Sequence, residues 1–147
     1  GARPSGGEIL DWLELAGYRL PPRVGWALRR IFSSGTPGQR TVRSLAVELD
    51  LSERTLRHAF HSAHLPPPHW WLAAARAVQV AAWAQASPAR TLTELALEHG
   101  YASLSDLDGA FRSLFGLAPS SARRIAGWEW LLAEGLRRHA APPAAGR

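Results

Sequence analysis

The stretch 52–60 carries a row of hydrogen-bond donors along one side of a predicted helix. Arg54, Arg57 and His58 fall on its outer face, and Ser52 lies where an N-cap should accept from free backbone N–H groups. The inner face is an apolar stripe at helical spacing, formed by Leu56, Ala59, Phe60 and Ala63. Outward guanidinium and imidazole groups can donate to phosphates or to base edges, so this face would suit the binding of DNA.

A second short helix must position these donors. Thr41 is placed to cap it, and Asp50-Leu51 joins it to the donor-bearing helix through a tight connection. Its inward residues are Val42, Leu45, Ala46 and Leu49. A helix, a short turn and a capped second helix with donors outward form the layout of a helix-turn-helix. Any two amphipathic helices of a bundle share this layout, so these residues alone leave DNA binding and plain packing equally open.

The same pattern returns about 50 residues later. Thr91 caps a second predicted helix pair, Gly100-Tyr101 makes its turn, and Ser105 is expected to cap its outer helix, 106–115. The two copies align residue by residue, with Leu45-Ala46 recurring as Leu95-Ala96, Leu56 as Leu107, Phe60 as Phe111, and Pro68 as Pro119. Two copies of one unit are harder to explain as a generic bundle, which favours DNA binding.

The remaining chain predicts further helices over 8–17, 23–32, 69–86 and 119–138. At the start of the long helix, Trp70 and Trp71 cannot both face inward, so Trp70 is expected at an interface. Residues 1–7 and the loop 33–39 are expected to lack regular structure. The expected domains are an N-terminal helical segment (1–40), a first helix-turn-helix (41–68), a linker helix (69–90), a second helix-turn-helix with a C-terminal helix (91–139), and a disordered tail (140–147).

The composition of the 147 residues is that of a globular protein, with 46% hydrophobic and 20% charged residues. The absence of Cys excludes disulfides, thiol nucleophiles and thiolate metal sites. Met is absent too, so the natural start is missing, and the sequence leaves open whether the chain is a fragment of a longer protein. No membrane-spanning run or signal peptide is visible, which predicts a cytoplasmic protein. All 17 basic residues are Arg, and the net charge of +5 suits a polyanionic partner without demanding one.

Over about 24–124, the chain resembles the AraC/XylS family of bacterial transcription regulators. The strongest signature is Gly100-Tyr101, Ser105, Leu107, Ala110-Phe111-Arg112, Phe115-Gly116, Pro119 and Arg123. The first half is similar to the family at Leu45-Ala46, Leu51-Ser52, Arg54, Leu56, Phe60 and the stretch from Pro68 through Trp71-Leu72 to Arg76. The resemblance implies an all-α fold with two helix-turn-helix subdomains joined by a long linker helix. Two recognition helices would enter successive major grooves of duplex DNA, with half-sites about one helical turn apart.

The resemblance also implies which side chains meet the DNA. Arg54, Arg57 and His58 correspond to base-facing positions, where Arg57 can reach N7 and O6 of a guanine and His58 can donate to a base edge. Helix N-termini and nearby cations would hold phosphates. The residues expected to do so are Arg40, Arg43, Ser52, His61, Arg90, Thr91, Ser105 and Arg112.

The second outer helix departs from the family pattern. Gly109 stands where family members commonly carry an outward Arg, and Asp106 and Asp108 lie beside it. Residues 91–116 carry one basic and four acidic residues, whereas 41–64 carry three of each. Carboxylates that face phosphates repel them. Our hypothesis is that the first unit provides the base readout, while the second serves as a scaffold or a protein-contact surface.

Positive charge gathers instead ahead of the first unit. Residues 19–40 contain five Arg and no acidic residue. The segment could follow the DNA backbone, or its Arg29-Arg30 pair could simply form a solvated helix face.

Other kinds of site find little support. His58, His61 and His64 spread around a helix rather than converge, so no metal site is expected. No nucleophile elbow or Gly-rich phosphate loop is present, so we expect neither an enzyme nor a cofactor.

The expected partner is double-stranded DNA, with no membrane partner. A family member usually has a separate sensor or dimerisation domain, and a contact with RNA polymerase is a further partner that the resemblance suggests. The alternative function is that of a degenerate AraC-like domain acting as a protein-interaction module. The acidic second helix favours that alternative, whereas Arg54 and Arg57 oppose it.

Overall fold

The computed structural model describes residues 3–33, 40–124 and 127–140, and every regular element within them is a helix. This confirms the predicted all-α fold. The helices are α1 (Gly6–Leu15), α2 (Pro22–Ile31), α3 (Val42–Glu48), α4 (Glu53–Ser62), α5 (Pro68–Ala86), α6 (Leu92–Glu98), α7 (Leu104–Phe115), α8 (Pro119–Ala122) and α9 (Trp128–His139). None of the described helices is long and apolar enough to cross a membrane.

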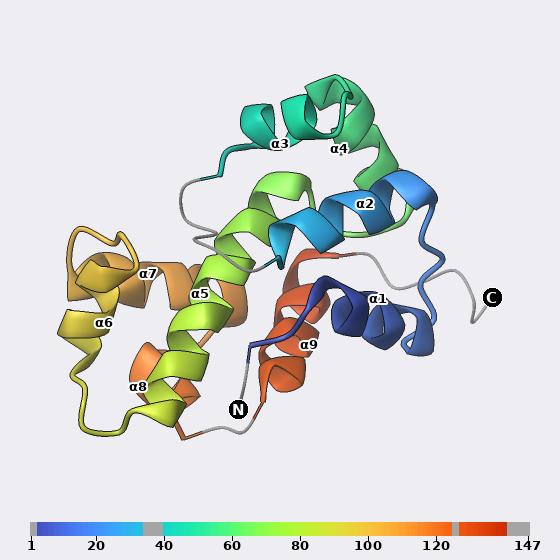
Figure 1. Ribbon diagram of the computed structural model, residues 1–147. Helices are drawn as coiled ribbons and strands as arrows, with labels where there is room; N and C mark the ends of the chain where they lie inside the picture. The colour runs from blue at the N-terminus through green and yellow to red at the C-terminus, as the bar shows by residue number, and fades with distance from the viewer. Residues whose placement is uncertain (1–2, 34–39, 125–126, 141–147) are drawn as a thin grey trace.

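The linker helix α5 runs through the middle of the molecule, and the other helices pack around it (Figure 1). Buried side chains lie on nearly all of its faces, as expected for a helix enclosed by protein. The prediction that Trp70 and Trp71 cannot both face inward was wrong, since they are only 5% and 0% exposed. Phe32 packs edge-on against Trp71 at 6.2 Å, and α9 covers Trp70 from another side. Both indoles are buried because α5 is wrapped by helices from both ends of the chain.

Two helix-turn-helix units flank α5: α3–α4 lies near its N-terminal end, and α6–α7 lies along its side, where Arg76 of α5 reaches the turn of the second unit (Figure 1). Their turns are built alike. Asp50 and Gly100 both adopt positive φ, of 55° and 83°, a conformation that Gly and Asp tolerate best. The following amides of Leu51 and Tyr101 donate to the carbonyls of Ala46 and Ala96, at 3.0 and 2.9 Å. The repeat seen in the sequence is therefore a repeat of backbone geometry.

The helix ends differ from prediction in the first residues of the chain. Helix α1 begins at Gly6, within the stretch 1–7 that was expected to be disordered. A capping box explains the early start: Glu8 N donates to Ser5 Oγ at 3.2 Å, and Ser5 N donates to Glu8 Oε1 at 3.1 Å.

The last predicted helix, 119–138, is two helices instead of one. Helix α8 ends at Ala122, and α9 begins after Gly127, whose φ of 83° is outside the range of a helix. The predicted loop at 34–39 and the tail at 141–147 lie outside the described residues.

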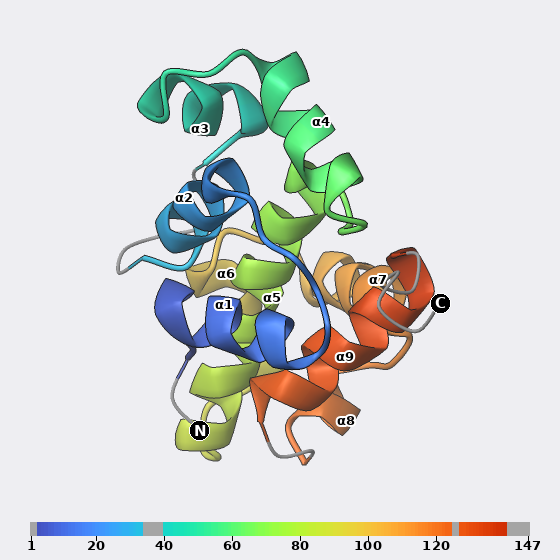
Figure 2. The same cartoon turned by 90° about the vertical axis from the view of Figure 1, so that its right-hand side faces the viewer.

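Helices α1 and α9 lie side by side across α5 (Figures 1 and 2). Trp12 of α1 meets Trp128 of α9 edge to face, with ring centroids 5.7 Å apart. Helix α1 packs on α2, which in turn packs on α3, α4 and α5, whereas α9 packs on α5 and α7. The pair therefore links the side of the molecule that carries the first unit to the side that carries the second.

Candidate nucleic-acid interface

Four polar side chains form one exposed stripe along α4. Arg54, Arg57, His58 and His61 stand at helical spacing and are all exposed, while Leu56 and Phe60 on the opposite face are fully buried. Ser52 is the N-cap, as predicted, and its Oγ accepts from Thr55 N at 3.0 Å. The helix therefore holds its donors outward because its apolar face is anchored in the core.

These donors are weakly engaged within the protein. Arg57 pairs with Glu53 at 3.6 Å, and both side chains are about half exposed, so water competes strongly with this contact. His58 Nε2 lies 3.3 Å from Ser62 Oγ. Arg54 forms no ion pair with any described residue. A nucleic acid could recruit all of these groups at little cost.

A basic cluster, formed by Arg30, Arg40 and Arg43, lies beside the short helix α3. Thr41 caps the helix as predicted, with its Oγ1 accepting from Ser44 N at 3.0 Å. Arg30 and Arg40 both reach Glu48, at 3.7 and 3.0 Å. Because one carboxylate faces two guanidinium groups, the cluster keeps a net positive charge. Arg43 stands exposed in the first turn of the helix beside it.

The second outer helix, α7, begins earlier than predicted. Its N-cap is Ser103, whose Oγ accepts from Asp106 N at 3.1 Å, and Ser105 lies inside the helix with an exposed side chain. The prediction that Ser105 is the cap was wrong. The repeat already contained the signal: Leu56 recurs 51 residues later as Leu107, and the same offset maps Ser52 onto Ser103.

That offset of 51 residues also aligns the exposed faces of α4 and α7. On α7 the stripe consists of Ser105, Asp108, Gly109 and Arg112, in place of the four donors of α4. Arg112 Nε pairs with Asp108 Oδ2 at 2.8 Å, so the single cation of the stripe faces its own carboxylate. A Cβ built on Gly109 would meet no atom within 4 Å. The face of α7 is thus open but almost without free donors.

The cation at the start of the second unit is also engaged. Thr91 caps α6 as predicted, accepting from Glu94 N at 3.1 Å. Arg90, expected to meet phosphate, pairs with Glu94 at 2.9 Å and with Glu98. These hydrogen bonds raise the pKa of Arg90, and the bond from Arg90 lowers the pKa of Glu94. At the start of the second unit, the positive charge of Arg90 therefore faces two carboxylates. In the first unit, by contrast, Arg30 and Arg40 share the single carboxylate of Glu48.

Two arginines quoted in the family resemblance, Arg76 and Arg123, hold the second unit in place, a role that the sequence analysis did not predict. Arg76 of α5 donates through Nε to the carbonyl of His99 at 2.8 Å and lies 4.0 Å above the ring of Tyr101. Arg123 donates to the carbonyls of Ala84 and Ser87, at 3.1 and 3.2 Å, and to that of Arg90. Their partners are backbone carbonyls far away in sequence, so local spacing could not predict these contacts.

Burial of Tyr101 has a consequence at alkaline pH. Desolvation raises the pKa of Tyr101 to about 12, although the charge of Arg76 opposes the rise. The folded state therefore keeps a proton that the unfolded state loses near its ordinary pKa of about 10. We expect full stability from this group below pH ~10 and a progressive loss as the pH rises towards ~12. Unfolding by urea along a pH series should show this loss.

The matched variant for that measurement is Tyr101→Phe, which keeps the ring under Arg76 but has no titrating hydroxyl. Its stability should fall less between pH ~10 and ~12 than that of the unaltered chain. Identical pH dependence in the two proteins would contradict the assignment to Tyr101.

A family described as Helix-turn-helix domain matches residues 45–125, more than half of the chain. The matched span contains α4 to α8 and most of α3, and it leaves out α1, α2 and α9. No curated protein and no solved structure matches the chain.

Proposed function

The chain belongs to the AraC/XylS family of DNA-binding transcription regulators, and from this premise we propose that it binds duplex DNA with base readout mainly by α4. Arg54, Arg57 and His58 would contact base edges. The second unit would add few or no base contacts.

The contrast between the two aligned stripes carries this proposal. At the positions where α4 has Arg57 and His58, α7 has Asp108 and Gly109. Bidentate Arg–guanine pairs are the commonest specific contact in the major groove, whereas a carboxylate is repelled by flanking phosphates. The same fold therefore presents a face that suits DNA on one unit and a face that opposes it on the other.

Phosphate contacts would hold α4 in register. The exposed Arg43 lies in the first turn of α3, Arg30 and Arg40 meet Glu48 at its last residue, and Ser52 marks the N-terminus of α4. Positive side chains and helix N-termini both favour phosphate oxygens. His61, the last member of the α4 stripe, would approach a phosphate. Arg90, Thr91, Ser105 and Arg112 would contribute less, because the cations among them are paired with carboxylates.

Selection of the chain against a random duplex library is the direct experiment. Enrichment of one short half-site would support readout by α4 alone. Two half-sites about ten base pairs apart would show that both units read bases, and the claim for α7 would be wrong. An absence of enrichment at low salt would favour the alternative, a protein-interaction module. A true DNA binder should in addition lose affinity steeply as salt rises, because each phosphate contact releases counterions.

Removing the carboxylates of α7 should not harm DNA binding. We expect Asp106→Ala combined with Asp108→Ala to leave affinity for the selected site unchanged or to raise it, because two negative charges near the DNA disappear. Fluorescence anisotropy with a labelled duplex measures this. A clear loss of specific affinity would sink the hypothesis that α7 is not a reading helix.

Gly109 on α7 has room for a larger side chain, so a substitution there can test whether an added positive charge increases DNA binding. Gly109→Arg should fit without a clash and should raise general DNA affinity several-fold, since one added phosphate contact steepens the salt dependence by roughly 0.9 in log–log slope. The control is Gly109→Gln, which is long and polar but uncharged. Equal affinities for the two variants would mean that α7 does not approach the DNA at all.

A further inference from the structure

A cavity of about 260 Å³ opens between α1, the C-terminal half of α5 and the start of α9. Ala81 and Ala82 form part of its α5 wall, and their small side chains leave the space between α1 and α9 unfilled. Leu131 and Val78 add apolar surface. The cavity lies away from the exposed stripes of α4 and α7, so the DNA interface makes no use of it.

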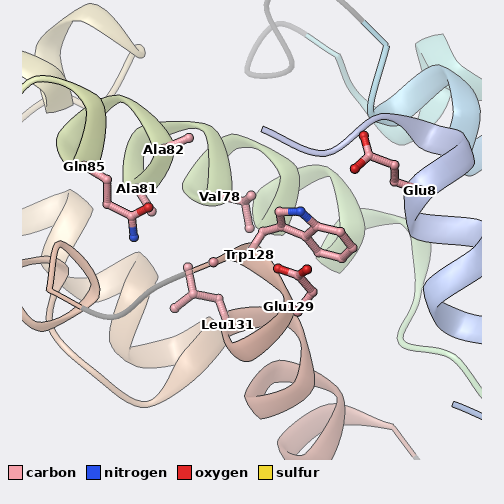
Figure 3. Close-up of a pocket in the computed structure, with 9 residues that line it drawn as sticks. Glu8, Val78, Ala81, Ala82, Gln85, Trp128, Glu129 and Leu131 are labelled. Atoms are coloured by element: carbon pink, nitrogen blue, oxygen red, sulfur yellow. The ribbon is translucent and has the colours of Figure 1, made fainter. Parts of the chain in front are cut away.

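The charged groups that line this cavity are negative. Among the described residues of its lining are the carboxylates of Glu8 and Glu129, the neutral amide of Gln85 and no basic side chain. Figure 3 shows the Glu129 carboxylate beside the indole of Trp128, with Glu8 facing them from α1. Neither carboxylate forms an ion pair with a described residue, and Glu8 accepts one hydrogen bond, from Ser5 N.

Trp128 supplies the third element of recognition. Its ring is held edge to face against Trp12, at 5.7 Å, and it also lines the cavity. The face of an indole attracts cations and also packs against apolar groups. Two carboxylates, an indole ring and small apolar side chains together suit a ligand that carries a positive charge on an apolar body.

We propose that this cavity binds a small organic cation, an ammonium group attached to an aromatic or aliphatic body. The ammonium lies between Glu8 and Glu129 against the Trp128 ring, and the body rests on Ala81, Ala82 and Leu131. The site is independent of the proposed DNA readout, because none of its residues belongs to that interface. A bound cation joins α1 to α9 and so stabilises the folded chain.

The test is a titration of the whole chain with benzyltrimethylammonium and, separately, with phenethylammonium, followed by the indole N–H signals in a ¹H–¹⁵N correlation spectrum. The chain has seven Trp, and the signal of Trp128 is identified by its loss in Trp128→Phe. We expect a saturable shift of this signal with a dissociation constant in the millimolar range or below. The anion phenylacetate, similar in size, should cause none.

Matched variants locate the site. Ala82→Leu fills the cavity and should abolish the shift, whereas Ala73→Leu, at an exposed position of the same helix, should leave it unchanged. Glu129→Gln should weaken binding by about threefold or more. Glu14→Gln removes the same charge from an exposed position of α1 outside the cavity and serves as its control.

Three outcomes would overturn the proposal: no saturable shift with either cation, an equal response to phenylacetate, or full binding by both Ala82→Leu and Glu129→Gln. Glu129 is exposed, so its variant remains informative even if Ala82→Leu fails to fold.

Discussion

Arg57→Ala is expected to lower the affinity for the selected DNA site by about 1–3 kcal/mol, or roughly 5- to 150-fold. The side chain stands in the middle of the exposed α4 stripe, and its one ion pair with a described residue, Glu53, is a half-exposed contact of 3.6 Å. Breaking that contact therefore costs little, and the loss should come from the base that Arg57 no longer meets. Binding to an unrelated duplex should change far less, so the ratio of the two affinities is the quantity to measure.

Arg112→Ala is the control for that measurement, because Arg112 stands on α7 in the same unit position as His61 on α4. It is already paired with Asp108 at 2.8 Å, so its removal should leave specificity nearly intact. Arg43→Ala is the second control and should weaken binding to specific and unrelated duplexes alike. A loss of specificity from Arg112→Ala as large as that from Arg57→Ala would refute readout by α4 alone.

Gly135→Val should lower the free energy of unfolding by about 1–3 kcal/mol, through overpacking of the core. Gly135 is a buried residue of α9, and a Cβ there would lie 2.5 and 2.7 Å from two carbons of the Trp70 indole. That indole is itself only 5% exposed and packs against Trp71, so it has no room to withdraw. Urea unfolding, with the slope of the transition checked for constancy, measures the loss.

Gly109→Ala, in helix α7, is expected to have the opposite effect and to raise the free energy of unfolding. Its Cβ would meet nothing within 4 Å, so only the helix preference of alanine remains, and stability should rise by up to about 1 kcal/mol. Gly135→Ala should destabilise, though less than Gly135→Val, because packing against Trp70 outweighs the same preference. If both alanine variants proved stabilising, the close approach of α9 to α5 would be wrong.

Local rules were enough for much of the fold. Thr41, Ser52 and Thr91 cap helices as predicted, because an N-cap needs only a side chain within three residues of its partner. The buried face of α4 followed in the same way from the spacing of apolar residues. The outward placement of Arg54 and Arg57 is the other side of that pattern.

Contacts between distant segments decided the rest. Trp70 and Trp71 are both buried because α9 and Phe32 arrive from opposite ends of the chain. The carbonyls that accept from Arg123 lie 33 to 39 residues away in sequence, so these hydrogen bonds depend on how the end of α5 and the loop after it pack against the end of α8.

The sequence by itself determined the repeated unit, its buried faces and the donors of α4, since periodicity and capping act within a few residues. The tertiary structure decided which of those donors are left unpaired, where α1 and α9 meet, and that a cavity with two carboxylates remains between them. A cavity is the space that several helices leave between their side chains, so no single stretch of sequence encodes it.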